Sequence, residues 1–439
     1  MLEILFVAIM LLLLLNLYFF KKQILSPAII FNSTFIPSII CSMINADKWE
    51  FSMNYNTFFV IFGGVIVFSI GCILMNYFMN LNYEKNNKIN IKYSYNLEID
   101  KWKLIIMIVY QIFTYILLYK NVKEIGLLYG SGDDISSILY GYQKMVKFSG
   151  EQIGLSGVVN SLNIIAYSSG FVWAYLLVLN LVQKVRKNRI LLIINFVLAI
   201  FGQFLKGDRG DSIALIVAFI VCFIFIYFSI YKQNGKKIKF KYFVYGILCF
   251  TTIILIFQSL GNIMGRNNEL KLWDYISIYI GAELKNLDSV LNSNIIHSKL
   301  WGQETFIYLI HWLGSKFNIN SWIEYDLYLP FRNVNGYSLG NVCTTFYPYY
   351  LDFGYTGVYI CTFIFGSFSQ FVFVKSKKNE EKNYRFNFWL ILYSYLFYCI
   401  FMSFFSNKFY EMFFNIKILK ILIVWIFLKW FIIKLKVKF

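Results

Sequence analysis

The chain has 439 residues, of which 59% are hydrophobic and 21% aromatic, while only 15% are charged. A soluble protein of this length rarely carries so few charges, and apolar runs of about 18 or more residues, long enough to cross a membrane, recur along it. Composition therefore excludes an ordinary soluble domain and predicts an all-α, polytopic integral membrane helical bundle, because a spanning segment must satisfy its own backbone. We attribute the net charge of +18 to cytoplasmic loops and expect no nucleic-acid partner.

The seven cysteines are scattered, mostly inside apolar runs, with no CxxC pair and no Cys/His cluster. This spacing predicts neither a metal site nor a disulfide framework. The sequence also lacks the glycine-rich and HExxH motifs of nucleotide and zinc enzymes. We therefore expect no cofactor.

Apolar runs predict about eleven membrane spans, within a range of ten to twelve. They lie at 1–20, 24–46, 57–80, 102–119, 156–182, 190–205, 212–231, 242–260, 344–374, 386–405 and 417–434. Residues 1–20 are interpreted as a first span and not a signal peptide, because no basic n-region or small-residue cleavage site is present. The chain thus divides into an N-terminal bundle (1–260), a large loop (261–343) and C-terminal spans (344–439).

Alternate connections between these spans form two sets, which differ in charge. One set is 21–22, 81–103, 184–189, 232–241, 375–385 and 434–439; the other is 47–56, 120–155, 206–211, 261–343 and 406–416. The first set contains most of the 41 lysines and arginines in short segments, which predicts a cytoplasmic location. We call it the inner set and the other the outer set. The N-terminus is then outside and the C-terminus inside, and most carboxylates lie on the outer face.

The outer loop 261–343 contains both histidines and has predicted structure of its own. Apolar residues at three-to-four spacing predict amphipathic helices at 273–292 and 300–317. On the polar side of the second helix, Glu304, Tyr308 and His311 are expected to form one stripe. Residues 330–343, rich in asparagine and glycine, are interpreted as an irregular loop of the kind that positions ligand contacts.

Three arginines near outer span ends are candidate phosphate contacts, since a guanidinium matches phosphate oxygens bidentately. They are Arg209, in the turn Lys206-Gly207-Asp208-Arg209-Gly210-Asp211, and Arg266 and Arg332 in the outer loop. The alternative for Arg209 is an ion pair with Asp208 or Asp211. The alternative for the other two is an interfacial arginine that reaches toward lipid headgroups.

Candidate general bases also lie on the outer side. His311 and Glu304 form one pair, with a polar interfacial helix face as the alternative. Asp352 lies at the start of an apolar stretch, where a carboxylate is costly to bury unless paired. A helix cap or an interfacial position is the alternative for Asp352.

The order of these features resembles the Wzy-type oligosaccharide repeat-unit polymerases of bacterial O-antigen and capsule pathways. The matching pieces are Gly207-Asp208-Arg209-Gly210, Tyr279-Ile280-Gly281 with Leu287-Asp288, Trp301-Gly302-Gln303-Glu304-Thr305-Phe306, and Gly340-Asn341-Val342-Cys343-Thr344-Thr345-Phe346 followed by Tyr350-Leu351-Asp352-Phe353-Gly354 and Gly357. The last piece is the most specific. Phe346-Tyr347-Pro348 departs from the more polar or basic character expected there.

The resemblance implies an inverting, metal-independent glycosyltransferase of the GT-C type in the bacterial cytoplasmic membrane, active on its outer face. Donor and acceptor would be oligosaccharides linked to undecaprenyl pyrophosphate. The three arginines would stabilise the pyrophosphate leaving group, and His311, Glu304 or Asp352 would be the base. Asp208, Asp211, Asn341 and Tyr350 would contact sugar. Membrane lipids, a chain-length regulator and a flippase of the same pathway are the expected partners.

Three alternatives compete with the polymerase. One is a non-enzymatic membrane scaffold, which would not need arginines and carboxylates gathered on the outer side. An O-antigen ligase would share the fold and the donor chemistry but use another acceptor. A lipid-linked oligosaccharide flippase would be expected to show internal repeats and polar groups near the membrane midplane. The sequence shows no such repeat, and its polar groups gather on one face. A composite cleft at the outer leaflet, built from the loop helices and span ends, is the predicted site.

Overall fold

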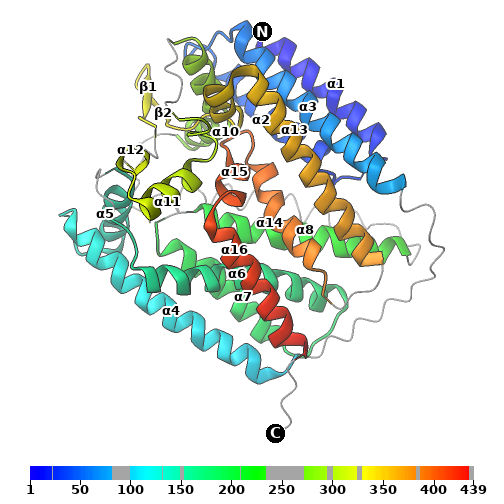
Figure 1. Cartoon of the computed structure of the whole chain (residues 1–439), viewed down its shortest axis with the longest axis vertical. Coiled ribbons are helices and arrows are strands. Elements are labelled where there is room, and N and C mark those ends of the chain that lie inside the picture. The colour runs from blue at the N-terminus through cyan, green and yellow to red at the C-terminus, as the bar shows by residue number, and fades with distance from the viewer. Residues whose placement is uncertain are drawn as a thin grey trace. The chain divides into compact units, whose positions relative to one another are not determined.

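The computed structural model describes residues 1–21, 23–81, 99–130, 132–148, 153–207, 209–233, 271–293, 300–323, 329–381 and 386–434. Within these ranges the protein is helical apart from one two-stranded sheet (Figure 1). The elements are α1 (Leu2–Phe19), α2 (Pro27–Ile44), α3 (Tyr55–Leu81), α4 (Lys101–Leu128), α5 (Ile135–Phe148), α6 (Gly157–Val182), α7 (Arg189–Phe204), α8 (Gly210–Gln233), α10 (Leu272–Leu291), α11 (Ile307–Phe317), α12 (Asn320–Ile323), β1 (Arg332–Val334), β2 (Tyr337–Gly340), α13 (Phe346–Glu381), α14 (Phe388–Phe401), α15 (Lys408–Phe413), α16 (Ile416–Lys429) and the π-helix η1 (Trp430–Lys434). The fold is therefore all-α, as predicted.

The chain forms two compact units, each assembled from segments distant in sequence. Unit 1 comprises Met1–Asn90, Lys271–Lys378 and Leu396–Ile416, and unit 2 comprises Ile91–Leu270, Asn379–Tyr395 and Lys417–Phe439. Each unit is described by itself below.

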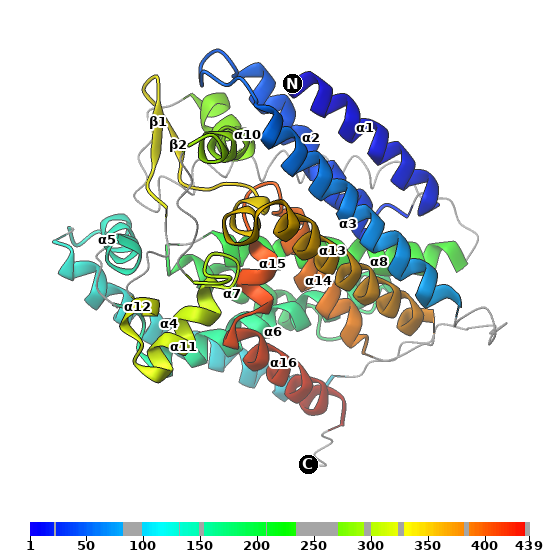
Figure 2. The same cartoon turned by 45° about the horizontal axis from the view of Figure 1, so that its top comes forward.

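In unit 1, helices α1, α2 and α3 lie side by side, and α10 packs against α2 and α3 (Figures 1 and 2). Pro27 begins α2, where a missing backbone N–H costs nothing. Gly281 allows α10 to approach α2 closely, because a Cβ there would lie 2.8 Å from that of Cys41. The hydroxyl of Ser42 donates to the Gly281 carbonyl at 2.8 Å across this contact. The predicted helix 273–292 is thus present, and most of its length is buried.

In unit 2, helices α4, α6, α7 and α8 pack against one another, and α5 packs on α4. Helix α6 is the most enclosed of the helices long and apolar enough to cross a membrane: 89% of its most apolar 18-residue stretch is buried, compared with 22% for α1 of unit 1. Gly202 of α7 fits against the ring of Tyr115, where a Cβ would lie 2.0 Å from a ring carbon. The close packing of α4 and α7 therefore depends on this glycine.

Seven helices in the described ranges are long and apolar enough to cross a membrane: α1, α2, α3, α4, α6, α8 and α13. These support a membrane-embedded protein. Helices α7 and α14 match predicted spans at 190–205 and 386–405 but are shorter apolar helices of 16 and 14 residues. Helix α16 covers most of the predicted span 417–434. The predicted span 242–260 lies outside the described residues.

Three local predictions were wrong. Helix α4 continues to Leu128, past the predicted span end at 119. Residues 330–343 are not irregular, because they contain the antiparallel β1–β2 hairpin. Its two-residue turn, Asn335-Gly336, has positive φ at both positions (47° and 78°), as tight hairpin turns require. The helix expected over 300–317 begins only at Ile307.

Helix α13 is broken near its start. Gly354 has φ 62° and ψ −152°, a conformation outside the helical region. Phe346–Phe353 therefore form a separate first segment of the predicted span 344–374. Glycine is suited to this position because side chains with a Cβ rarely adopt such a conformation.

Contacts within unit 1 group the connections as the alternate sets predict. Lys48 pairs with Asp274 at 2.7 Å, which joins two outer-set segments. Lys377 donates to Gln23 at 3.1 Å, and Lys378 donates to the Met79 carbonyl at 2.6 Å. These last contacts join span ends beside inner-set connections.

Unit 2 shows the same grouping. Lys417 lies 3.7 Å from Asp211, which brings the 206–211 turn to the outer-set end of α16. At the opposite helix ends, Asn188 donates to the Ile99 carbonyl at 2.6 Å, and Lys103 donates to the Ile432 carbonyl at 3.3 Å. Each unit thus has an inner-set end and an outer-set end. Which end faces outward stays a prediction of the charge distribution.

We predict that a membrane-impermeant maleimide added to intact cells labels Ser315→Cys but not Lys187→Cys. Both positions are exposed, the first in the outer set and the second in the inner set. The described native cysteines are buried and should react slowly. Labelling is scored by mass shift, with permeabilised cells as the control in which both variants react. The reverse labelling pattern would invert the predicted topology.

Candidate functional site

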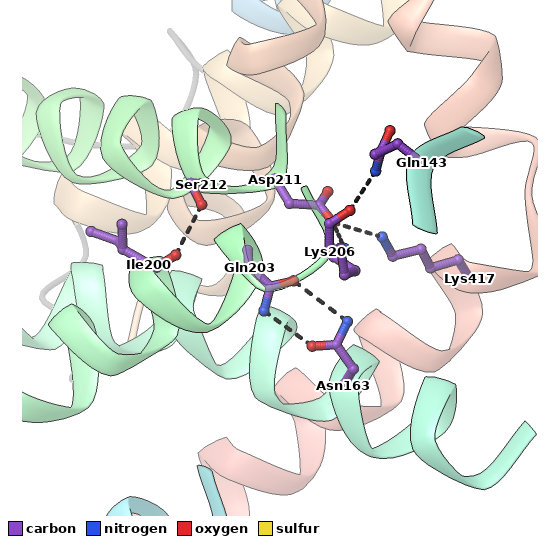
Figure 3. Close-up of polar contacts among 8 residues, drawn as sticks. All are labelled: Gln143, Asn163, Ile200, Gln203, Lys206, Asp211, Ser212 and Lys417. Carbon is purple, nitrogen blue, oxygen red and sulfur yellow. Dashed lines mark hydrogen bonds and ion pairs between the residues drawn. The ribbon is translucent and has the colours of Figure 1, made fainter. Parts of the chain in front are cut away.

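The turn that joins α7 to α8 forms a polar cluster in unit 2 (Figure 3). Lys206 pairs with Asp211 at 2.5 Å across the turn. Gly207, with φ 65°, allows the chain to reverse there. Asp211 lies in the first turn of α8, where the helix dipole favours a negative charge. The sequence pattern thus places both charges at one end of two helices.

Lys417 joins this cluster from α16. Its ammonium lies 3.7 Å from Asp211 and 4.5 Å from the centre of the Tyr167 ring. A lysine in the first turn of a helix is disfavoured by the helix dipole, so these contacts offset an unfavourable position. We call Lys206, Asp211 and Lys417 the Asp211 cluster.

Neutral side chains support this cluster. Gln143 of α5 donates to the Lys206 carbonyl, and Ser212 donates to the Ile200 carbonyl at 2.9 Å (Figure 3). Asn163 and Gln203 exchange hydrogen bonds at 3.5 and 3.3 Å, which joins α6 to α7. Such paired amides satisfy polar groups between apolar helices. The backbone beneath the charges is thereby fixed.

The charges of the Asp211 cluster are accessible. The side chains of Lys206, Asp211 and Lys417 are 15%, 22% and 32% exposed. Ion pairs at such exposure contribute about 0–1 kcal/mol, so an incoming anion can compete with the aspartate. Arg209 is the next residue before α8 and is buried. Three cations at one helix-end turn are chemically suited to a phosphate or pyrophosphate.

Unit 1 has a second polar cluster along α10. Asp288, itself buried, accepts from the Thr57 hydroxyl at 2.6 Å and from the Asn54 backbone N–H at 2.9 Å. Asn54 also donates through its side chain at 3.3 Å. Asp288 therefore fixes α10 to the start of α3, where the helix dipole favours a carboxylate.

The β1–β2 hairpin is bound to the same helix. Asn286 donates from Nδ2 to the carbonyls of Leu339 and Val342, both at 3.0 Å. Arg332 of β1 donates from Nη1 to the Asn286 carbonyl at 2.8 Å. One nitrogen of Arg332, a predicted phosphate ligand, is thus already engaged by a backbone carbonyl.

Asp352 fixes the turn that precedes α11. Its two carboxylate oxygens accept from the backbone N–H groups of Glu304 and Thr305, at 3.1 and 2.7 Å. Asn407 donates to the Thr305 carbonyl at 3.3 Å and accepts from Tyr349 at 2.9 Å. Asp352 thus stabilises a turn distant in the sequence and does not cap the start of its own helix, which begins at Phe346.

The predicted stripe of Glu304, Tyr308 and His311 was wrong. Glu304 lies in the turn before α11, whereas Tyr308 and His311 lie within the helix. Gly302, with φ 76°, and the bonds from Asp352 stabilise a turn over residues whose apolar spacing suggested a helix. Glu304 and His311 are both half-buried and both belong to unit 1.

The remaining predicted residues are distributed as follows. Asn341 donates to the Leu329 carbonyl at 2.9 Å, and the Tyr350 ring packs edge-on against Tyr355. Asp208 and Arg266 lie outside the described residues. Arg209 and Asp211 belong to unit 2, and Arg332, Asn341, Tyr350 and Asp352 belong to unit 1. The predicted composite cleft therefore stays a prediction.

Sequence reasoning missed Lys417, Asn286 and Glu283. Lys417 was counted within a span, although it lies at the outer-set end where charges are expected. Glu283 and Asn286 occupy the same side of α10 as predicted apolar residues such as Leu287. A polar residue within an apolar stripe is the signal that could have identified both.

In the described ranges, no group of three or more His, Cys, Asp and Glu residues is arranged to bind a metal ion. Comparison with protein-family models, curated proteins and solved structures gives no match. The class defined by fold and site is thus a helical membrane protein with clustered charges at its outer-set helix ends.

We predict that Asp288→Ala lowers the stability of unit 1 by about 2–4 kcal/mol, because it removes a buried acceptor from three donors. Asp274→Ala is the matched control on the same helix. Its partner Lys48 is 43% exposed, so its loss should cost about 1 kcal/mol or less. Thermal unfolding in detergent measures both. Equal effects would show that Asp288 is not the structural contact described here.

Proposed function

We propose that this protein is a Wzy-type polymerase of lipid-linked oligosaccharide repeat units. It transfers a glycan from undecaprenyl pyrophosphate to the non-reducing end sugar of another lipid-linked repeat unit, at the outer leaflet. The motif resemblance supports this proposal, and so do the apolar helices, which suit a substrate with a long hydrocarbon chain. The product would be an O-antigen or capsular polysaccharide.

The observation that carries the proposal is the Asp211 cluster with the adjacent Arg209. A pyrophosphate leaving group develops negative charge as the glycosidic bond breaks, and fixed cations lower the energy of that charge. Lys206, Arg209 and Lys417 offer such charges at one helix-end turn. Asp211 orients the two lysines before the substrate arrives.

The acceptor hydroxyl must lose its proton to a base during the transfer. Of the three candidates, Asp352 is the weakest, since both of its oxygens accept backbone hydrogen bonds. We therefore propose that His311 or Glu304 takes the proton.

We predict that Lys417→Met lowers the rate of polymerisation about 10–100-fold, since a charge-assisted hydrogen bond contributes about 1.5–3 kcal/mol. Purified protein is incubated with undecaprenyl-pyrophosphate-linked repeat units, and chain growth is scored on a gel. Lys420→Met, on the same helix, is the matched control. Lys420 lies 3.5 Å from the Ser161 hydroxyl and outside the cluster, so its loss should change the rate less than about twofold.

Equal rates in the wild type and in Lys417→Met would show that the Asp211 cluster takes no part in the reaction. The acceptor then tests the reaction class. Transfer to lipid A core without chain growth on lipid-linked units would identify a ligase, and no transfer to either acceptor would refute glycosyl transfer.

A further inference from the structure

Glu283 is a buried acid that the proposed function does not use. Its residue is only 1% exposed, and its Oε2 atom has no hydrogen-bond partner among the described residues. Burial holds the pKa of Glu283 well above its usual range. An unpaired buried carboxylate costs several kcal/mol, and uptake of a proton avoids most of that cost.

Asn286 lies three residues further along α10, and its side chain offers an acceptor that a protonated Glu283 could use. Asn286 is also 1% exposed. Its Nδ2 donates to the carbonyls of Leu339 and Val342, whereas its Oδ1 accepts from no donor in the described part of the chain. Side chains three residues apart on a helix are neighbours, with Cβ atoms about 5–6 Å apart. Two unpartnered oxygens therefore lie on one buried helix face.

Both side chains reach the segment that follows β2. Asn286 bonds the Val342 carbonyl, and the carboxyl of Glu283 acts electrostatically on the next residue, Cys343. Burial raises the pKa of the Cys343 thiol to about 12, and Glu283 adds to that shift. The hydrogen bond to Val342 and the electrostatic effect on Cys343 thus place both side chains close to the segment that follows the hairpin.

We propose that Glu283 is a protonated acid that donates its hydrogen to Oδ1 of Asn286, and that this bond locks the β1–β2 hairpin onto α10 until the proton leaves. One hydrogen then satisfies both unpartnered oxygens. The pair, named here the Glu283 latch, does not depend on the proposed function.

The orientation of the Asn286 amide couples the protonation of Glu283 to the hydrogen bonds that hold the hairpin. While Glu283 is neutral, Oδ1 faces its hydroxyl and Nδ2 faces the hairpin carbonyls. After the proton passes to solvent, the carboxylate repels Oδ1 and attracts a donor. Rotation of the amide then offers Nδ2 to Glu283 and breaks the bonds to Leu339 and Val342. The backbone contact of Asn286 with Arg332 is the third tie between helix and hairpin.

Among the described residues, few charged or titratable groups face the latch. They are Cys41 on α2, Cys343 after β2, Arg332 on β1, and Glu304, which acts on Cys343. The other charged groups of α10 are engaged elsewhere: Asp274 with Lys48, Lys285 with the Glu50 carbonyl, and Asp288 with Asn54 and Thr57. Arg332 is the one cation in the first group; it acts on the Cys343 thiol and donates to the Asn286 carbonyl.

The direction of the pH effect follows from the raised pKa of Glu283. The closed latch is fully stable below the unfolded-state pKa of about 4.3. Its contribution decreases as the pH rises and is lost when the pH passes the folded-state pKa. The hairpin should therefore open at higher pH.

Hydrogen exchange of peptides covering residues 332–343 tests the latch in the full-length protein. After correction for intrinsic exchange, wild-type protection should fall at least tenfold between pH 5 and pH 9. Glu283→Gln should remain protected throughout, because its amide donates to Asn286 at every pH. Asp274→Asn, the matched control carboxylate on α10, should follow the wild type.

Identical profiles for the wild type and Glu283→Gln would overturn the proposal. Infrared spectroscopy of the wild type gives a second test that needs no variant to fold. A protonated carboxylic acid should be visible at pH 7 and disappear with the same midpoint as the exchange change. The absence of that band at pH 7 would also overturn the latch.

Discussion

The burial of α10 against α2 and α3 is the interaction on which the polar surface of unit 1 depends. Gly281 permits the close approach to α2, and Asp288 binds the start of α3. Once α10 is fixed, Asn286 can reach the hairpin carbonyls from its buried side. A helix with an amphipathic sequence thus serves as the support of the hairpin and of Arg332, and most of its length is enclosed by protein.

In unit 2, polar groups beside apolar helices are satisfied in a different way. Its buried amides pair with each other, as Asn163 does with Gln203, while its charges gather at the helix ends. Paired amides satisfy their own hydrogen bonds, whereas the half-exposed Asp211 cluster keeps charge available to a ligand. The residues that satisfy hydrogen bonds between the helices therefore differ from those that carry the accessible charge.

The two proposals concern different units of the chain and use different chemistry. The Asp211 cluster gathers fixed cations, as departure of a pyrophosphate requires. In the Glu283 latch, loss of one proton releases the hairpin that contains Arg332. A hairpin that opens with pH would change the exposure of Arg332 whether or not the protein is a glycosyltransferase.

The sequence by itself determined the all-α class, most of the helix positions and the alternation of inner-set and outer-set connections, because these follow from local hydropathy and from charges beside each span. It could not place Lys417 beside Asp211, since residues some two hundred positions apart meet only in the folded chain. Nor could it show that the helix begins only at Ile307, because Asp352 of α13 stabilises the preceding turn. Tertiary structure alone decided that Glu283 and Asn286 are buried, for burial depends on which neighbours cover a helix face.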